Sequence, residues 1–477
     1  MSIAPSDLLT VVQPTVRLAD PHILSDIRDR RSIIDSLYDA LVRRDAQGDW
    51  IAWLAAAYTM ADDCQRWTFT LRPNIRCHDG STLTAADALA SIQRAIAPDL
   101  PGELGTQGVL AAYFVGAQFA AVGQTLTIMT AAPLADLLDL LVDVPIVPAH
   151  ALAGLPAQAV GSGPYRLVAA HEGQIELAAF AEHWAGTPPA ARLRFIAEPD
   201  AQRRGGLLLT GGADIVVDLP VAAGPAVIAA GGVVERRTSY LCVICMANCL
   251  AGPCVDPRVR RALNLALDLL ALIADPQIMD GRAQPIAGPV TMRHRGADHA
   301  LAPYRHDPVA ARTLLAEAGY ADGLALTIDL PARFPDESII LTERIAAMLA
   351  QVGVICTLRI HEDRPGYAEM VRAKQIGDLC VFDSSPPSTY RVLCEKLDAR
   401  RMGPWWQGYH NHALHTRLDQ AAATADATAR AACFARIVAL VHDDAPWLAL
   451  YAPDNLWGVG PRAQGWQPSD EGRVRVV

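Results

Sequence analysis

Three histidines stand close together in one short segment, as His410, His412 and His415. Imidazole nitrogen is a common ligand of nickel and of other late first-row metals. Their spacing, however, matches no standard metal-binding pattern, and histidines in a surface segment are often only solvated. We therefore predict no metal site in the chain, and metal coordination here stays the alternative interpretation.

Four cysteines are separated by two, three and four residues, which resembles the spacing of some zinc and iron–sulfur sites. They are Cys242, Cys245, Cys249 and Cys254. The run over residues 240–246 predicts a strand, on which Cys242 and Cys245 point to opposite faces. Because small thiols are common core residues, we predict structural cysteines rather than metal ligands.

An aspartate and an aromatic cluster are the best candidates for ligand contacts. Asp383 follows the apolar residues 379–382, which places it at the end of a predicted strand, where α/β folds recruit ligands. A turn cap made by Asp383 is the alternative. Trp405, Trp406 and Tyr409 lie in a predicted loop, where aromatic rings can stack on a ligand or a cation. Packing of that loop against its own domain is the alternative.

Motifs of the common enzyme classes are absent from the sequence. It contains no phosphate-binding loop, no His-Glu-x-x-His helix, no Gly-x-Ser-x-Gly elbow and no Gly-x-Gly-x-x-Gly that opens a helix. Cys77 and His78 are adjacent, but neighbouring side chains on an extended segment point apart. We therefore predict that the protein is not an enzyme and has no cofactor.

Composition limits the remaining classes. The 477 residues are 51% hydrophobic and 19% charged, which is typical of a globular chain of two to three domains. A net charge of -10 argues against nucleic acid as a partner. No apolar run approaches a membrane span, and residues 1–7 have no basic or long apolar region of a secretory signal. Ten cysteines fit a reducing compartment better than an oxidising one.

The pattern of the first half predicts a strand over residues 8–12, a helix over residues 32–42 and a half-buried strand over residues 67–71. Gly80 indicates a tight turn. Thr84 with Asp87 three residues later predicts a capping box for a helix that runs through residue 92. A helix end before residue 215 then leads into a buried strand.

Two Asp-Pro pairs predict helix starts in the second half, at Asp256-Pro257 and Asp307-Pro308. The first helix is expected to carry one apolar face, formed by Val259, Leu263, Leu267 and Leu270. A further helix is predicted over residues 337–351 and a strand over residues 354–360. Strands that alternate with helices predict an α/β architecture.

Five blocks, in the same order, resemble the family-5 extracellular solute-binding proteins, which serve peptide and nickel importers. The blocks are Leu37-Tyr38-Asp39-Ala40-Leu41-Val42 with Trp67-Thr68-Phe69-Thr70-Leu71-Arg72 and His78-Asp79-Gly80; Val160-Gly161-Ser162-Gly163-Pro164-Tyr165; Asn248 with residues 253–268; Tyr304 with Asp307-Pro308 and residues 314–320; and Gly408-Tyr409-His410-Asn411 with Asp443-Asp444-Ala445-Pro446. The chain departs from the family at Cys77, where Phe is usual.

The resemblance implies a two-lobed, periplasmic-binding-protein-like α/β fold of class II, large type. Lobe I would comprise residues 1–244 and 449–477, with a subdomain over about residues 30–160, and lobe II residues 245–448. A peptide, an opine-like small molecule or a metal complex would bind between the lobes, which close by a hinge motion. The protein would act as a periplasmic monomer that docks on an ABC permease. A cytoplasmic ligand sensor or chaperone with the same fold is the alternative.

The resemblance also implies roles for single residues. An aspartate placed like Asp383 pairs with the α-amino group of a peptide, and nickel-binding members use a histidine near His410. The segment of His22 lines the cleft, followed by Arg28, Arg30 and Arg31, for which a surface ion-pair face with Asp26 and Asp29 is the favoured interpretation. The expected ligand-binding residues are Asp383, Trp405, Trp406, Tyr409, His410, Tyr240, His22 and Arg30.

Overall fold

A computed structural model describes residues 6–23, 27–103, 106–333 and 335–477 of the chain. The chain divides into two compact units. Unit 1 comprises residues 1–101, 110–237 and 455–477, and unit 2 comprises residues 102–109 and 238–454. Each unit has a hydrophobic core of its own, and strand β18 (Trp447–Val459) takes part in the strand pairing of both units.

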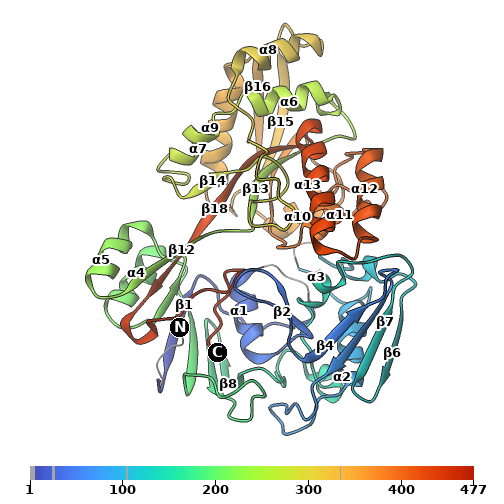
Figure 1. The fold of residues 1–477 in the computed structure, drawn as a ribbon. Coiled ribbons are helices and arrows are strands. Elements are labelled where there is room, and N and C mark those ends of the chain that lie inside the picture. The colour runs from blue at the N-terminus through green and yellow to red at the C-terminus, as the bar shows by residue number, and fades with distance from the viewer. Residues whose placement is uncertain (1–5, 24–26, 104–105, 334) are drawn as a thin grey trace. The chain divides into compact units, whose positions relative to one another are not determined.

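The main sheet of unit 1 has the strand order β18, β11, β1, β10, β9, β8, and β12 also pairs with β18 (Figure 1). The strands are β1 (Leu9–Gln13), β8 (Tyr165–His171), β9 (Gln174–Ala179), β10 (Arg192–Ala197), β11 (Ile215–Val217), β12 (Val233–Thr238) and the last part of β18 (Trp447–Val459). The central strand β1 pairs in parallel with β10 and β11, and all of its residues are buried. Burial on both faces suits its apolar residues Leu9, Val11 and Val12.

Helices of unit 1 are α1 (Arg28–Leu37), α2 (Ala85–Ala95), α3 (Leu137–Leu141), α4 (Ala201–Leu209) and α5 (Gly224–Ala229), with short 3-10 turns at Ala111–Tyr113, Ala149–Gly154, Val221–Ala223 and Pro461–Ala463. The predicted helix over residues 32–42 is wrong at both ends, because α1 begins at Arg28 and Tyr38 is already extended. The end of α1 is fixed by the Gly161–Gly163 segment. The amide of Gly163 donates to the Leu37 carbonyl at 3.1 Å, and a Cβ at Gly161 would lie 2.2 Å from that oxygen.

A second sheet in unit 1 has the order β4, β5, β7, β6 and is antiparallel throughout. Its strands are β4 (Ala55–Met60), β5 (Arg66–Leu71), β6 (Gln118–Val122) and β7 (Thr125–Met129), and β2 (Val42–Arg44) pairs separately with β3 (Trp50–Ala52). The strand predicted over residues 67–71 is confirmed as β5. The predicted capping box is confirmed too: the Thr84 amide and hydroxyl donate to Asp87 Oδ2 at 2.8 and 2.7 Å.

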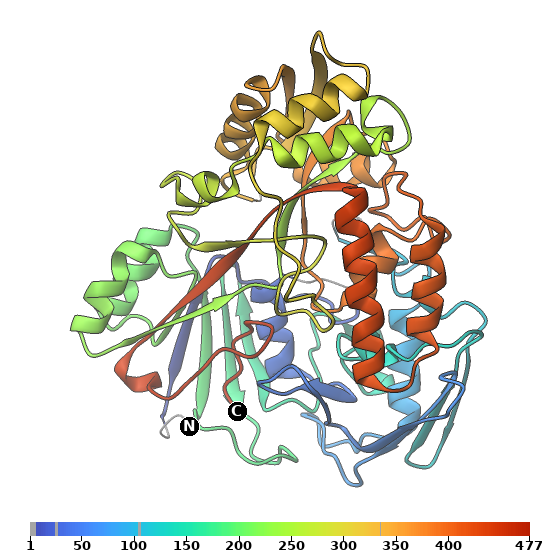
Figure 2. The same ribbon diagram turned by 45° about the horizontal axis from the view of Figure 1, so that its top comes forward.

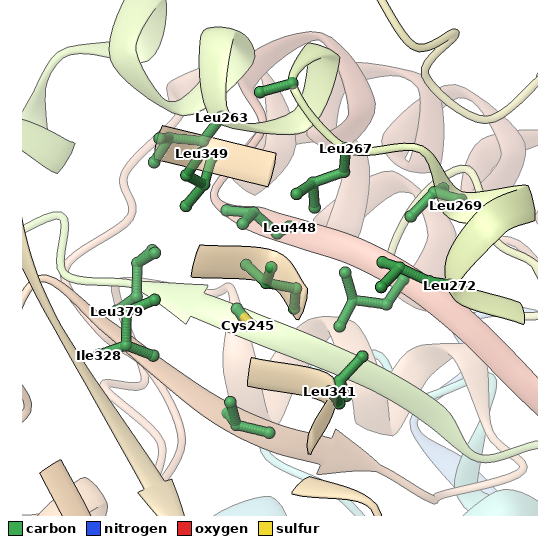
Figure 3. Packing of buried hydrophobic residues seen from close by; sticks show 14 of the residues in the cluster. Cys245, Leu263, Leu267, Leu269, Leu272, Ile328, Leu341, Leu349, Leu379 and Leu448 are labelled. Carbon is green, nitrogen blue, oxygen red and sulfur yellow. The ribbon is translucent and has the colours of Figure 1, made fainter. Parts of the chain in front are cut away.

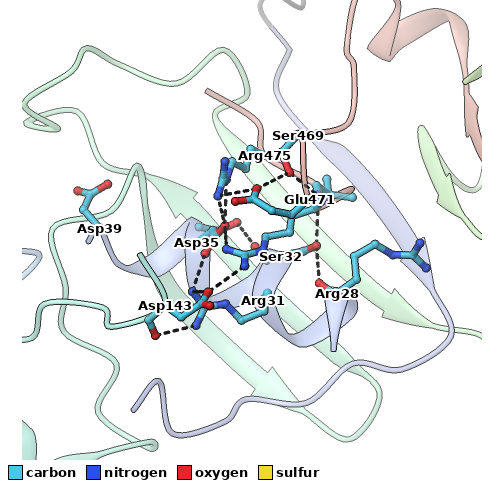
Figure 4. Close-up of polar contacts among 12 residues, drawn as sticks. Arg28, Arg31, Ser32, Asp35, Asp39, Asp143, Ser469, Glu471 and Arg475 are labelled. Atoms are coloured by element: carbon cyan, nitrogen blue, oxygen red, sulfur yellow. Dashed lines mark hydrogen bonds and ion pairs between the residues drawn. The ribbon is translucent and has the colours of Figure 1, made fainter. Parts of the chain in front are cut away.

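Figure 4 shows how the segment that follows β18 is held against α1 by buried charges. Asp35 lies 2.8 Å from the Arg475 guanidinium, 3.3 Å from that of Arg473 and 3.7 Å from that of Arg31. Asp143 lies 3.2 Å from the Arg31 guanidinium and 2.9 Å from that of Arg473. Burial alone would raise the pKa of Asp35, but these guanidinium groups hold that pKa below its ordinary value.

Unit 2 is built on a sheet with the order β16, β15, β17, β13, β18, and β14 pairs with β18 (Figures 1 and 2). The strands are β13 (Cys242–Ala247), β14 (Ala283–Pro285), β15 (Leu324–Pro331), β16 (Val354–His361), β17 (Leu379–Ser384) and the first part of β18. Strand β15 pairs in parallel with β16 and β17, whereas β13 pairs in antiparallel fashion with β17 and β18. The parallel part requires crossover helices, which the chain supplies.

The helices of unit 2 are α6 (Pro257–Leu265), α7 (Leu269–Ala274), α8 (Pro308–Glu317), α9 (Ser338–Ala350), α10 (Arg364–Arg372), α11 (Thr389–Lys396), α12 (His412–Ala422) and α13 (Ala427–Asp444), with a 3-10 turn at Pro253–Val255. Both predicted Asp-Pro starts are confirmed, because Asp256 and Asp307 accept backbone N–H groups of α6 and α8. The prediction of one apolar face that continues along this helix to Leu270 is wrong. Asp268 caps a new helix, α7, and Leu270 is 70% exposed.

The core of unit 2 gathers alternate residues of its strands, such as Val243, Cys245 and Ala247 of β13, which point to one face of the sheet and pack against helices (Figure 3). Leu263 of α6, Leu349 of α9 and Leu448 of β18 lie on one side of Cys245 in this view, and Ile328 and Leu379 lie on another. All five are fully buried. Cys245 is therefore a core residue, as predicted from the strand pattern.

All ten cysteines lie in the described part of the chain, and none of them forms a disulfide. Burial raises the pKa of Cys242 and Cys254 above the ordinary thiol value. Within the described residues, no group of three or more cysteines is close enough to bind a metal ion. The same residues contain no helix with the length and apolar character of a membrane span.

Candidate functional site

Asp383 lies in strand β17 of unit 2, opposite Val243 of β13. Its side chain is 11% exposed and accepts a hydrogen bond of 3.4 Å from Nη2 of Arg364, at the start of α10. Its carbonyl oxygen accepts a second bond of 3.2 Å from Nζ of Lys396, at the end of α11. The predicted carboxylate is thus part of a group that also contains two cations.

Two aromatic rings lie beside these cations. The rings of Phe382 and Trp405 have centroids 5.0 Å apart. Lys396 Nζ lies 5.4 Å from the Phe382 ring centroid and 5.6 Å from that of Trp405, and the Arg364 guanidinium lies 5.3 Å from the Phe382 centroid. We call Arg364, Phe382, Asp383, Lys396 and Trp405 the Asp383 cluster. It combines a carboxylate, two cations and two aromatic faces, and cations are attracted to such faces.

Sequence reasoning missed Arg364 and Lys396. Arg364 precedes a proline at the start of a helix, where its charge suggests nothing beyond a helix end. Lys396 offered a weak signal, because Lys374 and Lys396 are the two lysines of a chain whose other basic residues are arginines and histidines. A buried lysine in such a chain suggests a specific role for the ammonium group, and Lys396 is 3% exposed.

Trp406 and Tyr409, which we grouped with Trp405, make a different set of contacts. Trp406 Nε1 donates to the Tyr409 carbonyl at 2.6 Å, and the Tyr409 hydroxyl donates to Asp444 Oδ2 at 2.7 Å. Tyr409 is buried, and burial together with the Asp444 carboxylate raises the pKa of its phenol. These contacts fasten the loop before α12 to the end of α13.

His410, His412 and His415 are brought together in unit 2. One ring nitrogen of each lies within 4.8 Å of the others. His410 precedes the N-cap residue Asn411, and the other two belong to the first turns of α12. The local spacing alone did not reveal this convergence, because it depends on where the helix begins.

Tyr240 lies just before β13 and is buried. The Arg293 guanidinium lies 4.8 Å from its ring centroid, and the His294 ring meets it edge-on at 5.0 Å. His294 is itself buried, with Nε2 2.9 Å from the Pro386 carbonyl oxygen. Tyr240 therefore packs within unit 2 against a segment that follows β14.

His22 belongs to unit 1 and is held on both ring nitrogens. Arg94 Nη1 donates to Nδ1 at 3.0 Å, so Nε2 carries the proton and donates to the Pro145 carbonyl at 2.9 Å. Burial lowers the pKa of His22 to about 4, and the Arg94 charge acts in the same direction. The histidine is therefore neutral at physiological pH.

The surface ion-pair face predicted for Arg28, Arg30 and Arg31 is wrong. Arg30 and Arg31 are 6% and 2% exposed. Arg30 Nη2 donates to the Asp20 carbonyl at 2.8 Å, and Arg31 joins the buried network of Figure 4. Arg28 pairs with Asp218 at 2.6 Å instead of a helix neighbour, and the predicted partner Asp26 lies outside the described residues.

The profile of the bacterial extracellular solute-binding proteins, family 5, matches residues 49–386 of the chain. The chain belongs to this family. The glutathione-binding protein GsiB of Pectobacterium atrosepticum is 27% identical to this family-5 protein, in an alignment that covers 94% of the present chain and 88% of GsiB. The match confirms the family that the five sequence blocks indicated.

Solved structures show the same fold. The peptide-bound binding protein DppA of Helicobacter pylori has a TM-score of 0.83 and 20% identity, over 99% of this chain and 97% of that one. NikA of Staphylococcus aureus, solved with Ni(L-His)2, has a TM-score of 0.76 and 19% identity, over 98% of each chain. The family-5 protein thus has the mixed α/β fold of the periplasmic binding proteins, as predicted.

Membership decides between the two functions that the sequence left open. Family-5 proteins are solute-binding components of ABC importers, and they are binding proteins rather than enzymes. This favours the importer component over the cytoplasmic sensor or chaperone.

Proposed function

We propose that this family-5 protein captures a short zwitterionic peptide of the glutathione type and delivers it to an ABC permease. In this proposal it works as a periplasmic monomer and acts by binding alone, without catalysis. The observation that carries it is the Asp383 cluster, which presents a carboxylate and two cations on the same part of unit 2. The likeness to a protein named for glutathione binding supports the same ligand class.

The charges of the cluster complement a zwitterion. A peptide carries an ammonium group that pairs with a carboxylate such as Asp383, and one or more carboxylates that pair with guanidinium or ammonium groups such as those of Arg364 and Lys396. Charge-assisted hydrogen bonds are usually about 2.7–2.9 Å long. The 3.4 Å separation of Arg364 and Asp383 is longer, so exchange of this partner for ligand groups costs little.

Trp405 and Phe382 add apolar contact to this arrangement. Ligand sites of binding proteins are lined mainly by apolar and aromatic side chains, with a few polar groups that orient the ligand. Two hollows described elsewhere in unit 2 measure only 20 and 10 Å³. Those volumes suit a single water molecule rather than a peptide, so neither hollow is a candidate for the peptide site.

Calorimetric titration of the purified protein with reduced glutathione, dipeptides, an opine and a nickel–histidine complex tests the ligand class. A compound that binds the folded protein, at a concentration of about 100 times its dissociation constant, should also raise the free energy of unfolding by about 2.7 kcal/mol. Binding of glutathione or a dipeptide supports the proposal. Binding of only the opine or the nickel complex, or of none of the compounds, refutes it.

Asp383→Asn tests the cluster, and Asp322→Asn is the matched control because Asp322 is exposed in unit 2. Loss of a hydrogen bond between charged groups costs about 1.5–3 kcal/mol. We therefore expect Asp383→Asn to weaken peptide binding about tenfold or more. Equal affinity in both variants would show that Asp383 does not contact the ligand.

A further inference from the structure

The strongest unassigned feature is the group of three histidines at the start of α12. His412 is the first residue of the helix and His415 follows three positions later, so both side chains project from the same face. His410 reaches them from the preceding loop, while Asn411 between them accepts the Ala413 and Leu414 amides and fixes the helix start. The ring centroid of His410 lies 4.9 Å from that of His412 and 5.0 Å from that of His415.

The spacing of the ring nitrogens is close to what one shared ion requires. Late first-row ions bind imidazole at about 2.0–2.1 Å, so two nitrogens on one ion lie at most about 4.2 Å apart. The three nitrogens already lie within 4.8 Å of one another. His410 and His412 are exposed, so small rotations of their side chains close this gap without a change of the backbone.

The third histidine is preorganised by a buried carboxylate. His415 is 6% exposed, and its Nε2 has no hydrogen-bond partner among the described residues but lies 3.6 Å from Asp398 Oδ1. Asp398 is fixed by the Arg400 amide and guanidinium, each at 3.0 Å. A carboxylate behind a metal-binding histidine is the usual second partner of such a ring. In this proposal the proton of His415 is on Nε2, which faces Asp398, and Nδ1 is left for an ion.

The charge around the rings also suits a cation. The N-terminus of α12 carries a partial positive charge that opposes a cation, and the Asp398 carboxylate behind His415 offsets it.

We propose that His410, His412 and His415 form a binding site for one late first-row transition-metal ion, such as Ni²⁺, Cu²⁺ or Zn²⁺. Three nitrogen donors suit these ions rather than Mg²⁺ or Ca²⁺, which prefer oxygen. Water completes the coordination, because the first two histidines face solvent. The site departs from the prediction of no metal in the chain, and it does not depend on the ligand of the Asp383 cluster.

The test uses the whole protein without a histidine tag, titrated calorimetrically with Ni²⁺ and Zn²⁺. His410→Gln and His412→Gln remove exposed rings, so both variants should fold normally. His299→Gln is the matched control, because His299 is exposed in unit 2 but lies outside the group. We expect one ion per wild-type or control chain, and a loss of affinity of at least about tenfold in each of the other two variants.

Electron paramagnetic resonance of the Cu²⁺ form gives a second measurement. Splitting from imidazole nitrogens should appear in the wild-type spectrum and change in His412→Gln but not in His299→Gln. The proposal is overturned if the wild-type protein binds no ion, if all three variants bind alike, or if the copper spectrum is the same in all proteins.

Discussion

A buried histidine in unit 1 makes the stability of the protein depend on pH in a way that can be worked out from its contacts. His22 donates from Nε2 to Pro145 and accepts at Nδ1 from Arg94. Burial disfavours the charged imidazolium, and the Arg94 guanidinium beside Nδ1 acts in the same direction, which explains why the folded pKa of His22 is about 4 rather than 6.5. The unfolded chain therefore takes up a proton at a higher pH than the folded chain.

Because the folded pKa is the lower one, the contribution of His22 to stability is present above about pH 6.5 and is lost as the pH falls towards 4. The linkage relation gives a loss of about 2 kcal/mol between pH 7 and pH 5. Burial raises the pKa of Asp29 to about 6, which acts in the opposite sense over the same range. Stability against pH in the wild-type protein alone therefore does not isolate His22.

Comparison with His22→Gln isolates the effect. Glutamine keeps an N–H donor for Pro145 but does not titrate, while Asp29 and the other groups are common to both proteins. Urea unfolding at pH 7 and pH 5 should show the wild-type protein losing about 2 kcal/mol more than the variant. His171→Gln, at an exposed position in unit 1, should behave like the wild type. Parallel losses in the wild type and His22→Gln would refute the reasoning.

Two further predictions concern stability and use urea unfolding at constant pH. Gly161→Ala should destabilise unit 1 by about 3 kcal/mol, because its Cβ would lie 2.2 Å from a backbone oxygen. Gly206→Ala is the control: its Cβ would meet open space in helix α4, so it should stabilise unit 1 by about 0.5–1 kcal/mol. Changes of the same sign in both variants would contradict the close approach at Gly161. Leu272→Ala should cost unit 2 about 2–5 kcal/mol because Leu272 is 1% exposed, while Leu270→Ala should change stability by less than about 0.5 kcal/mol. A large loss for Leu270→Ala would support the single continuous helix face that the structure excludes.

The parts of the fold that sequence predicted well depend on contacts within a few residues. The capping box of Thr84 and Asp87 involves atoms three residues apart, and the caps at Asp256 and Asp307 accept amides two or three residues ahead. These interactions are complete in the local sequence. The order of five such local blocks along the chain indicated the family, because its members have the same blocks in the same order.

Errors arose where the deciding partner is distant in sequence or the local pattern has two meanings. The charges around Arg31 looked like a surface helix, but its partners include Asp143, far along the chain. The sequence pattern predicted a helical Tyr38, but the backbone of Gly161 and Gly163 lies against the end of α1, so the helix stops before it. The break before α7 had a local signal that we overlooked: Asp268 is itself a helix cap.

The candidate site shows the same division. Asp383 was identifiable because it follows an apolar strand, and Trp405 because aromatic residues cluster in its segment. Arg364 and Lys396 reach the same place from the first residue of one helix and the last residue of another, which no spacing in the sequence predicts. The convergence of the three histidines likewise became visible only when the start of α12 was known.

The buried charges that tie Arg473 and Arg475 to Asp35 have a consequence for the order in which the chain can fold. Unit 1 needs residues 455–477 as well as residues near the start, so its charge network cannot close until residue 475 is available. Nearly all of unit 2 is one continuous segment, residues 238–454, which is synthesised before that point. Although synthesis begins in unit 1, unit 2 is therefore the first to have all of its residues available. During that interval, Arg473 and Arg475, the late partners of Asp35 in helix α1, have yet to be made.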